Sequence, residues 1–144
     1  MGIKFTTKSL NPQGYKKYSE SLKKNIIQTL FIGSNWVKNS AIESITNGPK
    51  SGIQYPRRKG GTKMHTASAP GQAPATDTGV LRSNIVAEIE KTTLTAIVES
   101  RAKYSKFLEF GTRNMKPRPF MFPALEENKP KIRRLFAKTK GKAK

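Results

Sequence analysis

Apolar residues in the first third of the chain recur at a spacing close to that of an α-helix. The stripe consists of Tyr15, Tyr18, Leu22, Ile26, Leu30, Trp36 or Val37, Ala41 and Ile45. A period near 3.6 residues places these side chains along one helical face, while the lysines of this segment fall largely off it. The pattern predicts one long helix that packs along a single stripe.

Capping residues mark the ends of this helix. Asn11 suits the N-cap, and Pro12 suits the first helical position, where its missing N–H leaves no bond unmade. Asn47-Gly48-Pro49 ends the helix, because glycine favours the left-handed conformation that follows a helix. Gly33-Ser34-Asn35 is a candidate for a kink or an interruption. Before the helix, residues 3–7 are expected to form a short strand.

Two later segments alternate between apolar and polar residues. Ile85, Ala87 and Ile89 share one face of the first segment, and residues 94, 96 and 98 share one face of the second. The connection 91–93 is short, so we expect an antiparallel hairpin with one buried face. The glutamates of this hairpin, Glu88, Glu90 and Glu99, would face outward.

The C-terminal third is predicted to contain a short helix, a loop and a second helix. Residues 102–110 form the short helix and Gly111 ends it. The loop 113–119 is stiffened by two prolines. The second helix begins near Pro123, and Pro130 lies within it. We expect Tyr104, Phe107, Leu108 and Phe110 to anchor the short helix on the hairpin. Near Arg113, Lys116 and Arg118, the four phenylalanines at 107, 110, 120 and 122 could instead form a base-stacking platform.

Residues 49–79 show neither helical nor strand periodicity. The segment is rich in Gly, Pro, Ser, Thr and Ala, and loops of this length inside a compact domain are usually functional or disordered. Asp77 or Thr78 is expected to cap a short helical turn after it. The fold class is therefore α+β: a long N-terminal helix on a small antiparallel sheet, a long extended loop, short helices and a C-terminal helix. We expect a single domain over 1–138, with an assembly loop at 49–79 and a basic tail at 139–144.

The net charge changes the picture of possible partners. Lys and Arg total 28 against 9 Asp and Glu, which gives a formal net charge of +19. Such an excess is typical of chains that meet nucleic acid, anionic membranes or acidic proteins. Since no apolar stretch is long enough to span a bilayer, we expect no membrane association. The chain has no cysteine, which excludes disulfides and thiolate metal sites.

Residues that could support catalysis are few. His65 is the sole histidine and lies in the loop, where a solvated role is more common than a catalytic one. Glu126 and Glu127 are adjacent, so on a helix they point about 100° apart and cannot act as a facing acid/base pair. The glycine-rich segments lack the full phosphate-binding spacing. We expect no enzyme activity, catalytic residues, cofactor or metal.

Two segments carry a family resemblance. They are "TASAPGQAPATDTGVLRSNI" (66–85), and "YSKFLEFGT" followed by "KPRPFMFPALEEN" (104–128). In this order they resemble the neck or minor tail components of long-tailed bacteriophages, a gene-product-ten-like group similar in role to minor tail protein Z of phage lambda. The resemblance covers most of residues 10–136.

The resemblance implies a virion structural protein at the head–tail junction. Family members are expected to form a ring, six-fold, between head-closure or connector proteins and the tail tube or tail terminator. They assemble in the host cytoplasm and complete the tail without turnover. The alternative is a stand-alone basic nucleic-acid-binding protein.

This role implies two sets of contact residues. The expected subunit interface comprises Pro70, Gly71, Pro74, Thr78, Gly79, Glu109, Gly111, Arg113, Arg118 and Phe120. Candidates for contact with packaged DNA or acidic partners are Arg57, Arg58, Lys59, Lys63, Arg133 and Arg134. We expect the loop at 50–78 to lie across a neighbouring subunit or ring.

Overall fold

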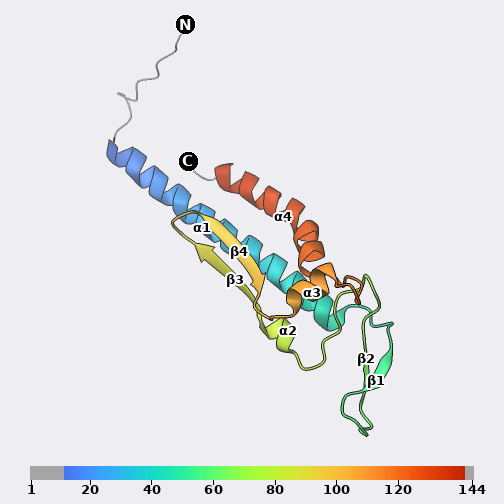
Figure 1. The fold of residues 1–144 in the computed structure, drawn as a ribbon. Coiled ribbons are helices and arrows are strands. Elements are labelled where there is room, and N and C mark those ends of the chain that lie inside the picture. Colours follow the sequence, from blue (N-terminus) through green and yellow to red (C-terminus); the bar gives the residue numbers. More distant parts are fainter. Residues whose placement is uncertain (1–11, 142–144) are drawn as a thin grey trace.

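The long helix forms as the apolar stripe predicts. In the computed structural model, which describes residues 12–141, helix α1 spans Pro12–Asn47 (Figure 1). The stripe becomes more buried along the helix: Leu22 is half-buried, whereas Ala41 and Ile45 are fully buried. Tyr18, near the start of the stripe, is exposed. The expected strand at 3–7 and the Asn11 cap lie outside the described residues.

The segment Gly33-Ser34-Asn35 does not interrupt α1, which continues as one helix through these residues. Ser34 Oγ and Asn35 Nδ2 both donate to the carbonyl of Phe31, at 3.1 and 2.8 Å, so both side chains bond to the backbone of their own helix. Gly33 has a packing role. A Cβ at this position would lie 3.2 Å from Cγ1 of Ile132, so glycine allows a second helix to approach closely.

The predicted hairpin is confirmed. Strands β3 (Ile85–Glu90) and β4 (Thr95–Ser100) pair antiparallel, with Ala87 opposite Val98. Ile85 is buried against α1, and the three glutamates face outward. The alternation therefore predicted both the element and its buried face.

Helix α4 (Met121–Gly141) lies antiparallel along α1, as Figure 1 shows. Two hydrogen bonds fix this orientation: Asn128 Nδ2 donates to Ser40 Oγ at 2.8 Å, and the hydroxyls of Thr29 and Thr139 lie 2.7 Å apart. Pro130 lies within the helix without ending it. Since α4 continues to Gly141, it takes in the start of the predicted tail at 139–144; the rest of that tail lies outside the described residues.

The core forms where the C-terminal half of α1 meets the hairpin and the start of α4. Between α1 and α4, the chain adds two short helices, α2 (Val80–Ser83) and α3 (Ser105–Phe110), with Gly111 ending α3 as expected. The buried apolar residues are Val37, Ala41, Ile45, Leu81, Ile85, Ala102, Phe120 and Ala124. Two of them are small alanines on facing helices, which allows α1 and α4 to pack closely.

The segment 49–79 contains structure that its composition did not predict. Strands β1 (Gln54–Pro56) and β2 (Met64–Thr66) pair antiparallel, with Tyr55 opposite His65. We refer to residues 53–66 as the arm. Figure 1 shows it projecting past the C-terminal end of α1. The expected cap of α2 is wrong: Gly79, with a φ of 81°, is the N-cap and no side chain caps the helix.

Candidate functional site

The two segments that carry the family resemblance meet in space. The N–H of Gly71 donates to the carbonyl of Pro117 at 2.9 Å, which ties the loop of the first segment to the loop of the second. Beside this contact lies a pocket of about 200 Å³. We call it the motif pocket; its lining includes Tyr55, His65, Pro74, Thr78, Gly79, Tyr104 and Arg118. Four of the predicted interface residues, Pro74, Thr78, Gly79 and Arg118, are thus brought together around one pocket.

The charged groups at the motif pocket are connected to the arm. Arg57 Nε lies 2.8 Å from Asp77 Oδ1, and His65 Nδ1 lies 3.8 Å from the same oxygen. The His65 ring is buried and meets Tyr55 edge to face at 5.2 Å. Arg57, which follows β1 at the outer end of the paired strands, therefore ties the arm to the loop at Asp77. Its side chain stays 46% exposed, so the partner contact expected for it remains a prediction.

Arg118 is held at the motif pocket by its backbone and not by a carboxylate. Its N–H donates to the carbonyl of Leu108 at 2.7 Å, and Nη1 lies 3.9 Å from Sδ of Met115. Its Nε is buried and has no hydrogen-bond partner among residues 12–141. A guanidinium in this state retains the capacity to bind an acceptor.

Glu109 forms the N-terminal cap of α4. Its carboxylate accepts hydrogen bonds from three successive backbone N–H groups, those of Phe120, Met121 and Phe122, at 2.9, 3.0 and 2.8 Å. A negative charge at this position also complements the helix dipole. Glu109 was predicted to be an interface residue, and nothing in the pattern of α3 indicated that its hydrogen-bond donors lie eleven residues further on.

Gly111 allows the chain to double back after α3. Its φ is 76°, and a Cβ there would lie 2.7 Å from the carbonyl oxygen of Met115 and 2.9 Å from Cδ of Pro117. The close contact is with backbone and a proline ring, which cannot move aside easily. Gly111 therefore shapes the corner that was predicted to lie at a subunit interface.

Replacing Gly111 with alanine is expected to lower the free energy of unfolding by about 1–3 kcal/mol, because strain and a clash combine. Gly60→Ala is the matched control, since Gly60 has the same φ of 76° but a Cβ there would meet nothing within 4 Å. Urea unfolding of both variants measures the difference. Equal losses for the two would show that the close approach at Gly111 contributes nothing.

The aromatic residues of this region are divided between core and surface in a way that differs from the prediction. Phe120 is 1% exposed and lies in the core of the single chain, so it is not accessible for the interface contact we expected. Conversely, the expected packing of Phe107 and Phe110 on the hairpin is wrong: they are 46% and 80% exposed. Of α3, Leu108 packs against the core.

An open apolar groove, which the sequence patterns did not reveal, lies between α1, β4 and α4. Its volume is about 550 Å³. We call it the apolar groove; its lining includes Leu30, Val37, Ala96, Val98, Phe110, Phe122, Leu125, Ile132 and Phe136. The exposed Phe110 belongs to this groove. Periodicity finds which residues share a face, but it does not tell whether the same chain covers that face.

The remaining predicted contact residues are spread over the surface. Pro70 and Arg113 are exposed on loops, and Arg133 and Arg134 are exposed on α4. Arg58, Lys59 and Lys63 are exposed near the tip of the arm. The structure thus does not gather the six basic candidates into one patch.

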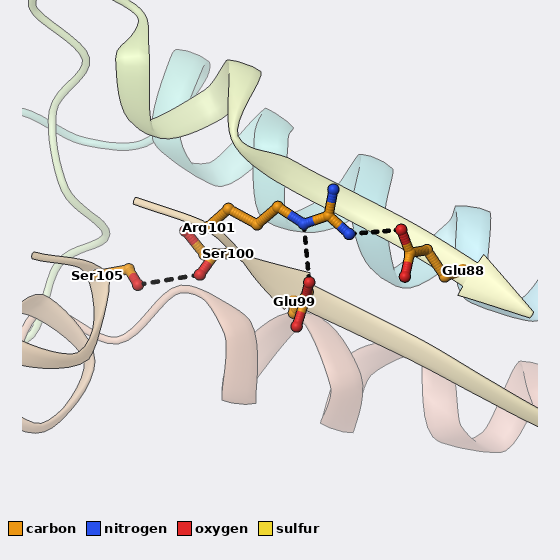
Figure 2. A network of polar contacts seen from close by, with 5 residues as sticks. All are labelled: Glu88, Glu99, Ser100, Arg101 and Ser105. Atoms are coloured by element: carbon orange, nitrogen blue, oxygen red, sulfur yellow. Dashed lines mark hydrogen bonds and ion pairs between the residues drawn. The ribbon is translucent and has the colours of Figure 1, made fainter. Parts of the chain in front are cut away.

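A polar network on the outer face of β3–β4 was also not predicted (Figure 2). Arg101 pairs with Glu88 through Nη2, and its Nε donates to Glu99 at 2.9 Å. The hydrogen bonds to Glu99 and Glu88 raise the pKa of Arg101 above its usual value, so its positive charge is secure. Ser105 Oγ donates to the carbonyl of Ser100 at 3.4 Å and links the strand end to α3. The sequence feature that could have predicted this network is the set of outward-facing glutamates followed by an arginine at the end of β4.

The described residues also limit the kinds of site present. Among residues 12–141, no group of three or more His, Cys, Asp or Glu side chains could hold a metal ion. No helix in that range is long and apolar enough to cross a bilayer. The prominent surface features are an exposed arm and an apolar groove, and exposed apolar surface of this kind is typical of proteins that contact other macromolecules.

The fold is α+β, with an exposed arm and an open apolar groove on its surface. The chain belongs to the family described as "Bacteriophage HK97-gp10, putative tail-component", which matches residues 13–111. This membership confirms the resemblance inferred from the two segments. It supports a structural role in the phage tail, and hence a place in the virion. No curated protein and no solved structure matches the chain.

Proposed function

We propose that the protein is a structural component of the phage neck, which joins head-closure or connector proteins to the tail tube or tail terminator. It works as part of a closed ring, six-fold, and completes the head–tail junction without catalytic turnover. Packaged DNA makes non-specific contact with its basic surface. Family membership supports the tail assignment, and the surface of the chain supports the finer role.

The observation that carries this proposal is the projecting arm. Every residue from 53 to 64 is exposed, and the arm contacts the body through Asp77, which lies near both Arg57 and His65. A two-stranded hairpin is marginally stable alone in water, so an arm of this kind gains most when another surface covers it. A closed ring provides such a surface on every neighbour.

The charge of the arm fits the same role. Arg58, Lys59 and Lys63 are exposed and form no ion pair with a described residue. In a ring these charges repeat around a central axis and create a strong positive field, which acidic partners or DNA can neutralise. Arg57 belongs to the same set of candidates, although its pair with Asp77 offsets part of its charge.

The test is genetic complementation. Phage particles produced with Arg58, Lys59 and Lys63 all changed to glutamate are expected to fall by at least about tenfold in yield, because charge reversal opposes docking. The control changes Lys17, Lys23 and Lys24 of α1 to glutamate. These lysines are exposed, and their replacement changes the net charge by the same amount. Circular dichroism of each purified variant checks folding. Equal yields for the two triple variants would contradict the role of the arm.

Location within the virion is tested separately by electron microscopy. Particles lacking the protein are expected to accumulate as DNA-filled heads and separate tails, and a label on the protein should mark the neck. Density at the distal tip, or along the tube, would contradict the proposed junction. If the protein is instead a stand-alone nucleic-acid-binding protein, it should be a monomer that prefers particular nucleic-acid sequences, and the label should not appear on virions.

A further inference from the structure

The apolar groove is an uncovered surface on each copy. On its rim, Phe122 and Leu125 of α4 are 63% and 45% exposed, and Phe110 of α3 is 80% exposed. Val98 of β4 and Val37 of α1 line the opposite side. Apolar side chains gathered in an open concavity of about 550 Å³ are typical of a binding surface.

The arm is the matching uncovered element. Met64 is 54% exposed although it is apolar, and it lies directly opposite Pro56, which is also exposed, on one face of the arm. The strands of the arm form backbone hydrogen bonds with each other. At the base of the arm, the N–H of Gly52 donates to the carbonyl of Ala67 at 2.8 Å. The outer part of the arm therefore presents apolar side chains that the rest of its own chain leaves in contact with water.

The position of the arm prevents it from filling the groove of its own copy. On α1 the groove is bounded by residues 29–37, whereas the arm leaves the far end of the helix after Asn47 and projects away (Figure 1). The loop that returns from the arm is tied down there, because the N–H of Thr76 donates to the carbonyl of Ile45 at 3.3 Å. A second copy is free of this restriction, and such a head-to-tail contact is the kind that closes a ring.

Charge gives the contact an orientation. The tip of the arm carries Arg58 and its two neighbouring lysines, at 59 and 63, without ion-pair partners among the described residues. The outer face of β3–β4, on the other side of β4 from the groove-lining Ala96 and Val98, carries three glutamates, two of which pair with Arg101. The other side of the groove leads to the basic half of α4. Attraction to the hairpin and repulsion from α4 direct the tip toward the glutamates.

We propose that the arm of one copy docks in the apolar groove of the next copy, with Met64 and Pro56 in the groove and the basic tip reaching past the edge of β4 to the outer face of β3–β4. The inference rests on the proposed ring and names its donor and acceptor surfaces. The buried apolar area supplies affinity, and the charges select direction.

The absence of native cysteine makes thiol crosslinking a clean test. Met64→Cys places a thiol on the arm, and Leu125→Cys places one on the groove rim; both positions are exposed. The two full-length single variants are mixed and treated with a short bifunctional thiol reagent. We expect a covalent dimer containing one copy of each variant. Ser19→Cys, exposed on the first half of α1, replaces Leu125→Cys in the control mixture and should give little product.

The outcomes separate this inference from the proposed function. Light scattering of the same samples before crosslinking reports whether discrete oligomers form. Oligomers without a Met64–Leu125 product above the control would overturn the arm-in-groove contact and leave the ring standing. A dominant product joining two Leu125→Cys copies would indicate groove-to-groove packing and would also overturn it. A chain that stays monomeric, alone and with its neck partners, would refute the ring and the inference together.

Discussion

Phe120→Ala is expected to lower the free energy of unfolding by about 3–5 kcal/mol, the range typical of removing a buried aromatic ring. Phe120 is 1% exposed and is among the largest fully buried side chains among the described residues. It packs where α4 begins, in the cluster that joins α4 to α1 and the hairpin. The cavity left by alanine would loosen that junction, and urea unfolding with fluorescence detection at Trp36 measures the loss.

The matched control for this substitution is Phe110→Ala. Phe110 comes from the same stretch of sequence and carries the same side chain, but it is 80% exposed. It should change the free energy of unfolding by less than about 0.5 kcal/mol, as is usual for surface substitutions. If Phe110→Ala proved as destabilising as Phe120→Ala, the division of these aromatics between core and surface would be refuted. Because Phe110 lines the apolar groove, its substitution should instead weaken oligomer formation.

Glu109→Ala is expected to cost about 2 kcal/mol of folding stability. The carboxylate accepts three backbone hydrogen bonds at the start of α4, and its loss leaves these donors without their partner. Glu109→Gln should cost less, since the amide oxygen keeps part of the cap but loses the charge. Urea unfolding of both variants measures the two contributions.

Glu126→Ala serves as the control for Glu109→Ala. Glu126 lies on the helix that Glu109 caps, and its ion pair with Lys129 at 3.0 Å is solvent-exposed on both sides. Exposed pairs contribute at most about 1 kcal/mol, so this variant should remain close to the wild type. A loss for Glu109→Ala no greater than that for Glu126→Ala would remove Glu109 from its capping role and return it to the surface role first expected for it.

The elements that could be predicted were those with enough repeats of one period. Helix α1 carries its stripe over many turns, and the β3–β4 alternation extends through six residues in each strand, so both patterns exceed chance. Strands β1 and β2 have three residues each, which is too short for alternation to be recognised. The α+β class followed from the longer elements alone.

The site was harder to predict because its parts are tertiary. The sequence identified Pro74, Thr78, Gly79 and Arg118 through family-like segments, and the structure places them around one pocket. The sequence could not reveal the ion pair between Arg57 and Asp77, because these residues lie on different loops. The apolar groove draws on α1, β4, α3 and α4, so no local pattern describes it.

The burial gradient along α1 has a consequence for motion. The first half of the helix is largely exposed, from residue 16 to residue 24, and its contact with α4 begins near Thr29, where the Thr139 hydroxyl lies 2.7 Å away. Helical turns that lack tertiary contacts open with far smaller free energies than turns held in a core. A single unbroken helix therefore contains two regions of different local stability: an inner half held by the core, and an outer half that opens at a lower free-energy cost.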